Sequence, residues 1–308
     1  MSLPAAIIDR LRLPLIAAPM LRVSGPELVT AACTAGVIGA FPTANARTAA
    51  ELDDWLSRIE GTTGAPYAAN LIIRSPRLAA DLRVLVEHRV ELVITSVGSP
   101  APVIDPLHEV GALVLADVAT LHHAERAVAA GADGLILLTA GAGGQTGWLN
   151  PFAFVRAVRA FFDGPVVLAG GISDGHALHA ARALGCDLAY MGTKFLATRE
   201  SRADPAYKRM VAEADLDDIV LTRAFTGLPT SMLAPAIRAA GLDPAALDES
   251  ISPADADQLY GHGGIGPRRW SDVWSAGHSV SGVTAAPSVA ELVEQTATEF
   301  AEARKGFS

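Results

Sequence analysis

The sequence predicts an α/β fold, a (β/α)8 TIM barrel with a smaller mixed cap inserted late in the chain. Short apolar segments alternate with helical patterns through about the first two thirds of the 308 residues. Four of the helical patterns end in a glycine that is followed, within at most three positions, by an apolar strand: Gly36, Gly111, Gly131 and Gly185. Glycine accepts the left-handed backbone that ends a helix, and all-apolar strands suit a sheet that is covered on both faces. This alternation indicates a parallel sheet.

Eight strands follow from this pattern. We expect them at residues 15–17, 37–40, 67–72, 92–95, 112–116, 134–138, 166–169 and 188–191. Between them we expect helices, for example at 48–60, 76–88, 120–130, 151–161 and 174–184. Pro76 and Pro151 suit the first turns of two of these helices. Eight units favour closure into a barrel, and an open doubly wound sheet is the alternative.

The alternation stops near residue 203, and the rest of the chain forms two further segments. Residues 204–282 mix helical patterns with loops rich in Pro, Gly and Asp, and we interpret them as a cap that contacts the substrate. Residues 283–308 contain an amphipathic helix that we expect to pack back on the barrel, which occupies residues 1–203. The large apolar residues of the cap form either the roof of a pocket or a second small core: Phe225, Met232, Leu233, Trp270 and Trp274.

Composition and charge narrow the classes of function. A net charge of −9 and the lack of a Lys/Arg run argue against a nucleic-acid partner. No apolar run approaches the roughly 18 residues of a membrane span, and the first residues do not resemble a signal peptide, so we expect a cytoplasmic protein without a membrane partner. Cys33 and Cys186 stand in no metal-binding motif and are expected to be buried thiols.

The ends of the last two strands predict a phosphate site. The seventh strand is followed by Gly170 and Gly171, and the eighth by Gly192 and Thr193. In TIM barrels these two loops bind phosphate, because glycines let backbone N–H groups approach the anion and a short helix directs its positive end toward it. The alternative is that the glycines only form tight strand-to-helix turns. At the other strand ends most residues are small or uncharged, which suits a planar cofactor that brings its own reactivity.

Several motifs carry a resemblance to a known family. They are P-L-I-A-A-P-M at 14–20, A-A-N-L at 68–71, A-G-A-G-G-Q-T-G at 140–147, L-A-G-G-I at 168–172 and M-G-T-K-F-L-A-T-R-E-S at 191–201. Through nearly its whole length the chain resembles the nitronate monooxygenases, also called 2-nitropropane dioxygenases. The resemblance implies FMN as cofactor, bound by the following residues: Ala18, Pro19, Met20, Asn70, Gly144, Gly170, Gly171, Gly192 and Thr193.

The chain departs from the family in the glycine-rich loop after the sixth strand. Members that oxidise nitroalkanes generally have E-A-G-G-H there, and Gln145 stands at the position of the histidine. A glutamine amide forms hydrogen bonds but does not accept a proton from carbon near neutral pH. We therefore expect Gln145 to orient an anionic nitronate. Asp117 and His262 are the candidates for a replacement base, with a helix N-cap and an ordinary loop histidine as their alternatives.

The resemblance predicts an FMN-dependent oxidoreductase with Gln145, Asp117 and His262 as catalytic candidates and no metal. It would oxidise alkyl nitronates with O2 to a carbonyl compound and nitrite. The alternatives are an NAD(P)H-dependent flavin reductase of quinones or enoyl thioesters, a family member with lost or changed chemistry, and a metal-free isomerase or lyase of a phosphorylated metabolite. The expected partners are a small-molecule substrate and either O2 or NAD(P)H, and the sequence leaves the oligomeric state open.

Overall fold

A closed barrel of eight parallel strands forms the centre of the computed structural model, which describes residues 3–261, 263–284 and 286–306. The strands pair in the order β1-β2-β3-β4-β5-β6-β8-β9, and β9 closes the ring against β1. Their bounds are β1 (Leu15–Ala17), β2 (Ile38–Pro42), β3 (Tyr67–Ile72), β4 (Leu92–Ser96), β5 (Leu113–Val118), β6 (Gly134–Leu138), β8 (Val166–Ala169) and β9 (Leu188–Met191). The predicted TIM barrel is confirmed, and the open-sheet alternative is wrong.

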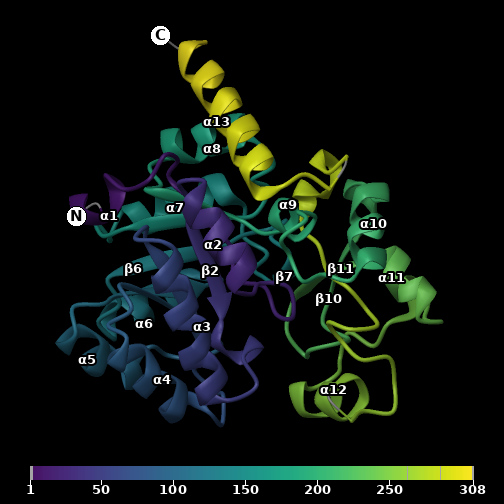
Figure 1. Ribbon diagram of the computed structural model, residues 1–308. Helices are drawn as coiled ribbons and strands as arrows, with labels where there is room; N and C mark the ends of the chain where they lie inside the picture. The colour runs from purple at the N-terminus through teal and green to yellow at the C-terminus, as the bar shows by residue number, and fades with distance from the viewer. Residues whose placement is uncertain (1–2, 262, 285, 307–308) are drawn as a thin grey trace.

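Helices cover the outside of the barrel (Figure 1). They are α2 (Pro26–Thr34), α3 (Ala49–Thr62), α4 (Leu78–Glu87), α5 (Ala101–Glu109), α6 (Leu121–Ala129), α7 (Pro151–Arg159) and α8 (Gly175–Leu184). The four predicted helix-ending glycines all have positive φ angles, from +82° at Gly111 to +105° at Gly185. Pro151 occupies the first turn of α7 as predicted. The prediction for Pro76 is wrong, because Pro76 lies in a turn closed by Ser75 and α4 begins at Leu78.

The barrel interior is filled by apolar side chains that alternate along the strands. Ile16, Ile38 and Leu92 are completely buried there. Leu3 and Ile7, from the short helix α1 (Ala5–Ile8) and the residues before it, belong to the same cluster and close the amino ends of the strands. Access to the barrel is therefore from the carboxyl ends, which we call the mouth.

A second, smaller sheet lies away from α1, on the other side of the barrel in Figure 1. It consists of β10 (Ile219–Thr222), β11 (Thr230–Leu233) and β7 (Gly144–Gln145), all antiparallel. Around it stand α10 (Pro205–Glu213), α11 (Ala234–Ala239) and α12 (Pro253–Tyr260). From the sequence we expected only helices and loops here. Because β7 comes from the loop after β6, the barrel and residues 204–282 share this sheet.

The remaining elements connect the barrel to its surroundings. The final helix α13 (Val289–Lys305) packs against α8 and α2, and its first turn is closed by a capping box between Ser288 and Glu291. The short α9 (Thr193–Leu196) follows β9. Four 3₁₀ helices complete the described part of the chain: η1 (Thr43–Asn45), η2 (Leu216–Asp218), η3 (Pro244–Ala246) and η4 (His278–Gly282).

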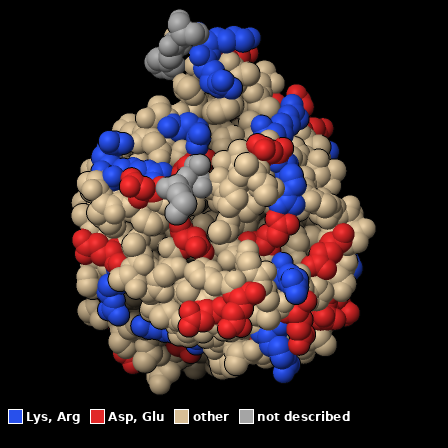
Figure 2. All heavy atoms as spheres, turned by 90° about the vertical axis from the view of Figure 1, so that its left-hand side faces the viewer, with Lys and Arg blue, Asp and Glu red and all other residues tan. Residues whose placement is uncertain are grey.

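Charged side chains are distributed without a basic cluster on the face that bears α1. Figure 2 shows Lys and Arg interspersed with Asp and Glu over this face. Among the described residues, no helix is both long enough and apolar enough to span a bilayer.

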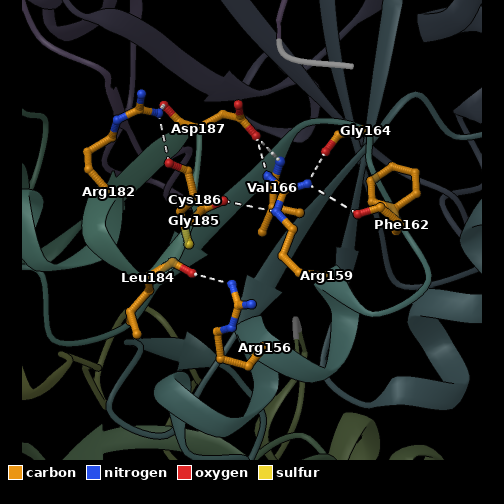
Figure 3. Close-up of polar contacts among 10 residues, drawn as sticks. All are labelled: Arg156, Arg159, Phe162, Gly164, Val166, Arg182, Leu184, Gly185, Cys186 and Asp187. Atoms are coloured by element: carbon orange, nitrogen blue, oxygen red, sulfur yellow. Dashed lines mark hydrogen bonds and ion pairs between the residues drawn. The ribbon is translucent and has the colours of Figure 1, made fainter.

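Aspartates tie neighbouring strands together at the amino ends of the barrel. Asp187, which precedes β9, accepts hydrogen bonds from Arg159 Nη2 at 2.6 Å and from the N–H of Val166 in β8 at 2.9 Å. Figure 3 shows Arg159 also directed toward the carbonyls of Phe162 and Gly164. Asp133, which precedes β6, similarly accepts a hydrogen bond from the N–H of Val114 in β5 at 2.7 Å. The aspartates thus fix the spacing of consecutive strands.

We expect Asp187→Ala to lower the free energy of unfolding by about 1–3 kcal/mol, because it removes the acceptor of a strand N–H and one acceptor of a mostly buried guanidinium. Urea-induced unfolding followed by circular dichroism measures this loss. Asp187→Asn keeps an acceptor for the Val166 N–H and should lose less. Unfolding of Asp187→Ala at the wild-type urea concentration would show that the contact does not stabilise the barrel.

Candidate active site

The described barrel strands present neutral polar side chains and one carboxyl group at the mouth. Side chains alternate along a strand, so Asp117 faces the same way as the interior residues Leu113 and Leu115 of β5. By the same rule Asn70, Ser96 and Tyr190 face inward from β3, β4 and β9, where Ala68, Ile94 and Leu188 belong to the interior cluster. The fold therefore brings together four polar side chains that are far apart in the sequence.

Asn70, a predicted cofactor contact, is buried and held in place by β4. Its Nδ2 donates to the carbonyl of Ile94 at 3.3 Å and to Ser96 Oγ at 3.2 Å. Ser96 Oγ in turn lies 3.4 Å from Asn70 Oδ1. The next residue, Val97, has a φ of +55°, which β-branched residues rarely adopt, so the backbone is strained directly at the mouth.

The loop after β1 contains the predicted contacts Ala18, Pro19 and Met20. Ala18 is buried and donates its N–H to the carbonyl of Met191 at 2.9 Å, whereas Pro19 and Met20 are partly exposed. Asn45 of η1 holds this loop, because its Nδ2 donates to the carbonyls of Met20 at 2.9 Å and Ser24 at 2.8 Å. Asn45 was not predicted from the sequence, because it stands 25 residues away from Met20 in a segment without a recognisable motif.

The glycine loops after β8 and β9 leave backbone exposed at the mouth. A Cβ at Gly170 would lie 2.5 Å from Thr139 Oγ1, so only glycine fits there, and φ is +121°. Gly171 has a φ of +70°, and nothing lies within 4 Å of the place where a Cβ would be. Gly192 is the N-cap of α9, and Thr193 is buried with its Oγ1 accepting the N–H of Gly277 at 2.9 Å.

The loop after β6 is fixed from two sides. Gln145 and Gly144 pair with Thr230 and Ser231 of β11, so Gln145 stands in a short strand. On the other side, the N–H of His278 donates to the carbonyl of Gly141 at 2.9 Å. Gly144 has a φ of +70° with open space beside it, and Gln145 is partly exposed. The structure therefore places Gln145 beside the mouth, in a loop that is held by backbone contacts on both sides.

Asp117 has an unusual environment for a carboxyl group. The side chain is partly accessible, but its Oδ1 is buried and has no hydrogen-bond partner among the described residues. Burial raises the pKa of Asp117 to about 7. The alternative role as helix N-cap is wrong, since Thr120 caps α6 by accepting the N–H of His123 at 3.1 Å.

Tyr190 is a further mouth residue that the sequence analysis did not identify. Burial, together with the negative charge of Asp117, raises its pKa well above the usual value for tyrosine. Tyr190 therefore remains protonated and able to donate a hydrogen bond. Its position two residues after Leu188 in an apolar strand was the available signal.

The catalytic candidate His262 is outside the described residues. Lys194, which follows Thr193 in α9, donates to the carbonyl of Gly282, and burial lowers its pKa. Cys33 and Cys186 are buried free thiols, as predicted. No group of three His, Cys, Asp or Glu residues suitable for a metal ion occurs in the part of the chain that the structure describes.

The large apolar side chains of the segment 204–282 that we expected over a pocket divide between two environments. Phe225 and Met232 are completely buried in a separate small core, so their predicted place in a pocket roof is wrong and the second-core alternative holds for them. Trp274 is partly buried and stacks on Tyr207 with ring centroids 5.0 Å apart. The segment 204–282 therefore has its own packing, which supports β11 and through it the loop of Gln145.

Comparison with protein families gives a match over most of the chain. The family model described as nitronate monooxygenase matches residues 77–299. The chain belongs to this family. Its members are oxidoreductases and in general flavoproteins.

Individual relatives differ in the activities that their names give. A dehydrogenase of an indene-carboxyl-CoA compound from Mycobacterium tuberculosis, (3aS,4S,5R,7aS)-5-hydroxy-7a-methyl-1-oxo-octahydro-1H-indene-4-carboxyl-CoA dehydrogenase, is 30% identical over 71% of this chain and 62% of its own length. The chain thus matches less than two thirds of that relative. Relatives named nitronate monooxygenase match as well.

Two solved structures share the fold over nearly the entire chain. FabK from Thermotoga maritima is 28% identical, with a TM-score of 0.84, and the match covers 100% of this chain and 98% of FabK. The nitroalkane oxidase from Streptomyces ansochromogenes is 30% identical, with a TM-score of 0.81, over 98% of this chain and 100% of that protein.

Proposed function

We propose that the protein is an FMN-dependent oxidoreductase that oxidises alkyl nitronates with O2 to a carbonyl compound and nitrite. The observation that carries the proposal is the mouth itself, with exposed glycine backbone at the ends of β8 and β9 and Gln145 where nitroalkane-oxidising members have histidine. The family membership and the similarity to a nitroalkane oxidase support it.

The residues at the mouth fit FMN. Gly170, Gly171, Gly192 and Thr193 would hold the phosphate, because the backbone is exposed at Gly171 and a side chain at Gly170 would collide with Thr139. The flavin ring would lie against these residues: Ala18, Pro19, Met20, Asn70 and Gly144. When bound, FMN supplies the electron acceptor for the substrate and the electron donor for O2.

The protein's own contribution to nitronate oxidation is to bind and orient the substrate. A nitronate is already deprotonated at carbon, so no base is needed before electrons leave it. The amide of Gln145 would donate a hydrogen bond to a nitronate oxygen, and the pairing of β7 with β11 would keep that amide in position. Residues 204–282 would then act as the substrate region by supporting this loop.

Oxidation or reduction of acyl thioesters is the second candidate function. The observation that favours it is the name of the Mycobacterium tuberculosis relative, which is a dehydrogenase of a carboxyl-CoA compound. In this reaction NAD(P)H could replace O2 as the partner of the flavin. A thioester substrate would use the same mouth and the same FMN site.

We expect Gly171→Asp to reduce FMN binding at least tenfold, because its carboxylate would oppose the phosphate at an exposed backbone position. Fluorescence titration of the apoprotein with FMN measures the dissociation constant. Gly111→Asp is the matched control, since Gly111 also has a positive φ of +82° and open space but lies at the amino end of β5. Equal loss of FMN in both variants would indicate backbone strain, and undiminished binding in Gly171→Asp would contradict the phosphate site.

We expect the wild-type enzyme to oxidise ethyl nitronate far more efficiently than nitroethane, because Gln145 supplies no base. A positioned general base contributes about 10²- to 10⁴-fold, so Gln145→His should raise nitroethane turnover within that range and change nitronate turnover little. Nitrite release from each substrate at one pH measures both efficiencies.

Gln145→Ala is the control for the amide, and it should weaken nitronate turnover without creating activity on nitroethane. Equal wild-type efficiency on nitroethane and ethyl nitronate would show that another residue acts as the base. Absence of nitrite from both substrates, together with turnover of an acyl-CoA, would favour the second candidate function.

A further inference from the structure

Asp117 is the only charged residue in the eight strands of the barrel, all of which lie in the described part of the chain. Strands β1 to β6, β8 and β9 otherwise contain apolar residues and a few neutral polar ones. A lone carboxylate in such a wall would need a cation or several donors to offset its desolvation. The packing of the barrel alone therefore does not account for a carboxyl group at this position.

The described neighbours of Asp117 supply no positive charge. On β6 its register partner is Ile136, and on β4 the next inward residue is the uncharged Ser96. Across the barrel, β9 presents Tyr190, which is titratable but neutral. Helix α6 packs on the outside of β5, away from the mouth. Asp117 Oδ1 is thus buried among neutral groups and lacks a partner.

We propose that Asp117 acts as a neutral carboxylic acid that donates a hydrogen bond to a negatively charged oxygen of the substrate. This inference rests on the proposed function, in which the substrate is an anionic nitronate. No strand of the barrel offers that anion a lysine or arginine, which favours neutral donors at the strand ends. A protonated Asp117 adds a donor, whereas an ionised Asp117 would repel the anion at short range.

The electrostatic environment supports this assignment. Burial raises the pKa of Asp117 to about 7, so the acid form predominates below neutral pH. Tyr190, on the opposite side of the mouth, remains protonated through the same range and provides a second neutral donor. The substrate would therefore bind most tightly on the acidic side of neutrality and lose affinity as Asp117 ionises.

The protonation state of Asp117 is testable without any substrate. A carboxyl group whose pKa is raised by folding contributes stability that is complete below its unfolded pKa near 4 and is lost as the pH rises to about 7. Relative to Asp117→Asn, the unfolding equilibrium constant of the wild type should therefore rise between about tenfold and a thousandfold from pH 4 to pH 7.5 and then level off. Urea unfolding across this range measures the difference. A constant difference between the two proteins would overturn the proposal.

The pH profile of nitronate oxidation tests the role of the acid. For the wild type, kcat/KM for ethyl nitronate should fall about tenfold per pH unit above pH 7, through a rise in KM. Asp117→Asn keeps a neutral donor and should remove this decline. Asp117→Val removes the donor and should raise KM about tenfold or more even at pH 6, consistent with loss of a hydrogen bond to a charged group.

Two comparisons separate the outcomes. Tyr190→Phe retains Asp117 and should keep the alkaline decline, which shows that the decline belongs to the carboxyl group. Equal loss of activity in Asp117→Asn and Asp117→Val would contradict the proposal. So would an alkaline decline that persists in Asp117→Asn. If no variant, including the wild type, oxidises nitronate, the proposed function fails, and the unfolding profile still decides whether Asp117 is held neutral.

Discussion

The close approach of three backbone segments around Gly143 and Gly277 is the contact on which the mouth of the barrel depends. A Cβ at Gly277 would lie 2.5 Å from the carbonyl oxygen of Gly141, and one at Gly143 would lie 2.8 Å from the N–H nitrogen of Gly277. The Gly277 N–H also reaches Thr193 Oγ1. Only glycines allow the loop after β6, the start of α9 and the segment before η4 to meet in this way, and the pairing of β7 with β11 fixes the loop from its other side.

Beside this contact, the strand ends and glycine loops of the mouth present mostly neutral groups. Exposed backbone at Gly171 and Gly144, a buried amide at Asn70 and a neutral phenol at Tyr190 are groups that bind by hydrogen bonding, without charge. In such surroundings a single carboxyl group has a large effect, because little water or countercharge screens it. Asp117 therefore decides the charge of the mouth, and a redox cofactor would supply the reactivity that the side chains lack.

The barrel was predictable from the sequence because each strand and helix is indicated by residues within or next to it. Helix-ending glycines such as Gly185, and all-apolar strands such as residues 166–169, locate each unit within a few residues of its observed bounds. The small sheet was not predictable, since β7 has only two residues and pairs with a strand more than 80 positions later. Asn45 and Tyr190 were missed because their roles arise from neighbours that the closed barrel brings to them. The sequence identified Asp117 as a candidate base. That its Oδ1 has no hydrogen-bond partner among the described residues follows only from the fold.

The most direct test of the account is an anaerobic reduction of the purified protein, reconstituted with FMN where necessary and followed by absorbance in the flavin bands. The account predicts that the protein binds FMN stoichiometrically and that ethyl nitronate bleaches the bound flavin without NAD(P)H. A protein that does not retain FMN would contradict the cofactor assignment. A bound flavin that is bleached by NAD(P)H or an acyl-CoA, and not by nitronate, would contradict nitronate oxidation as the function.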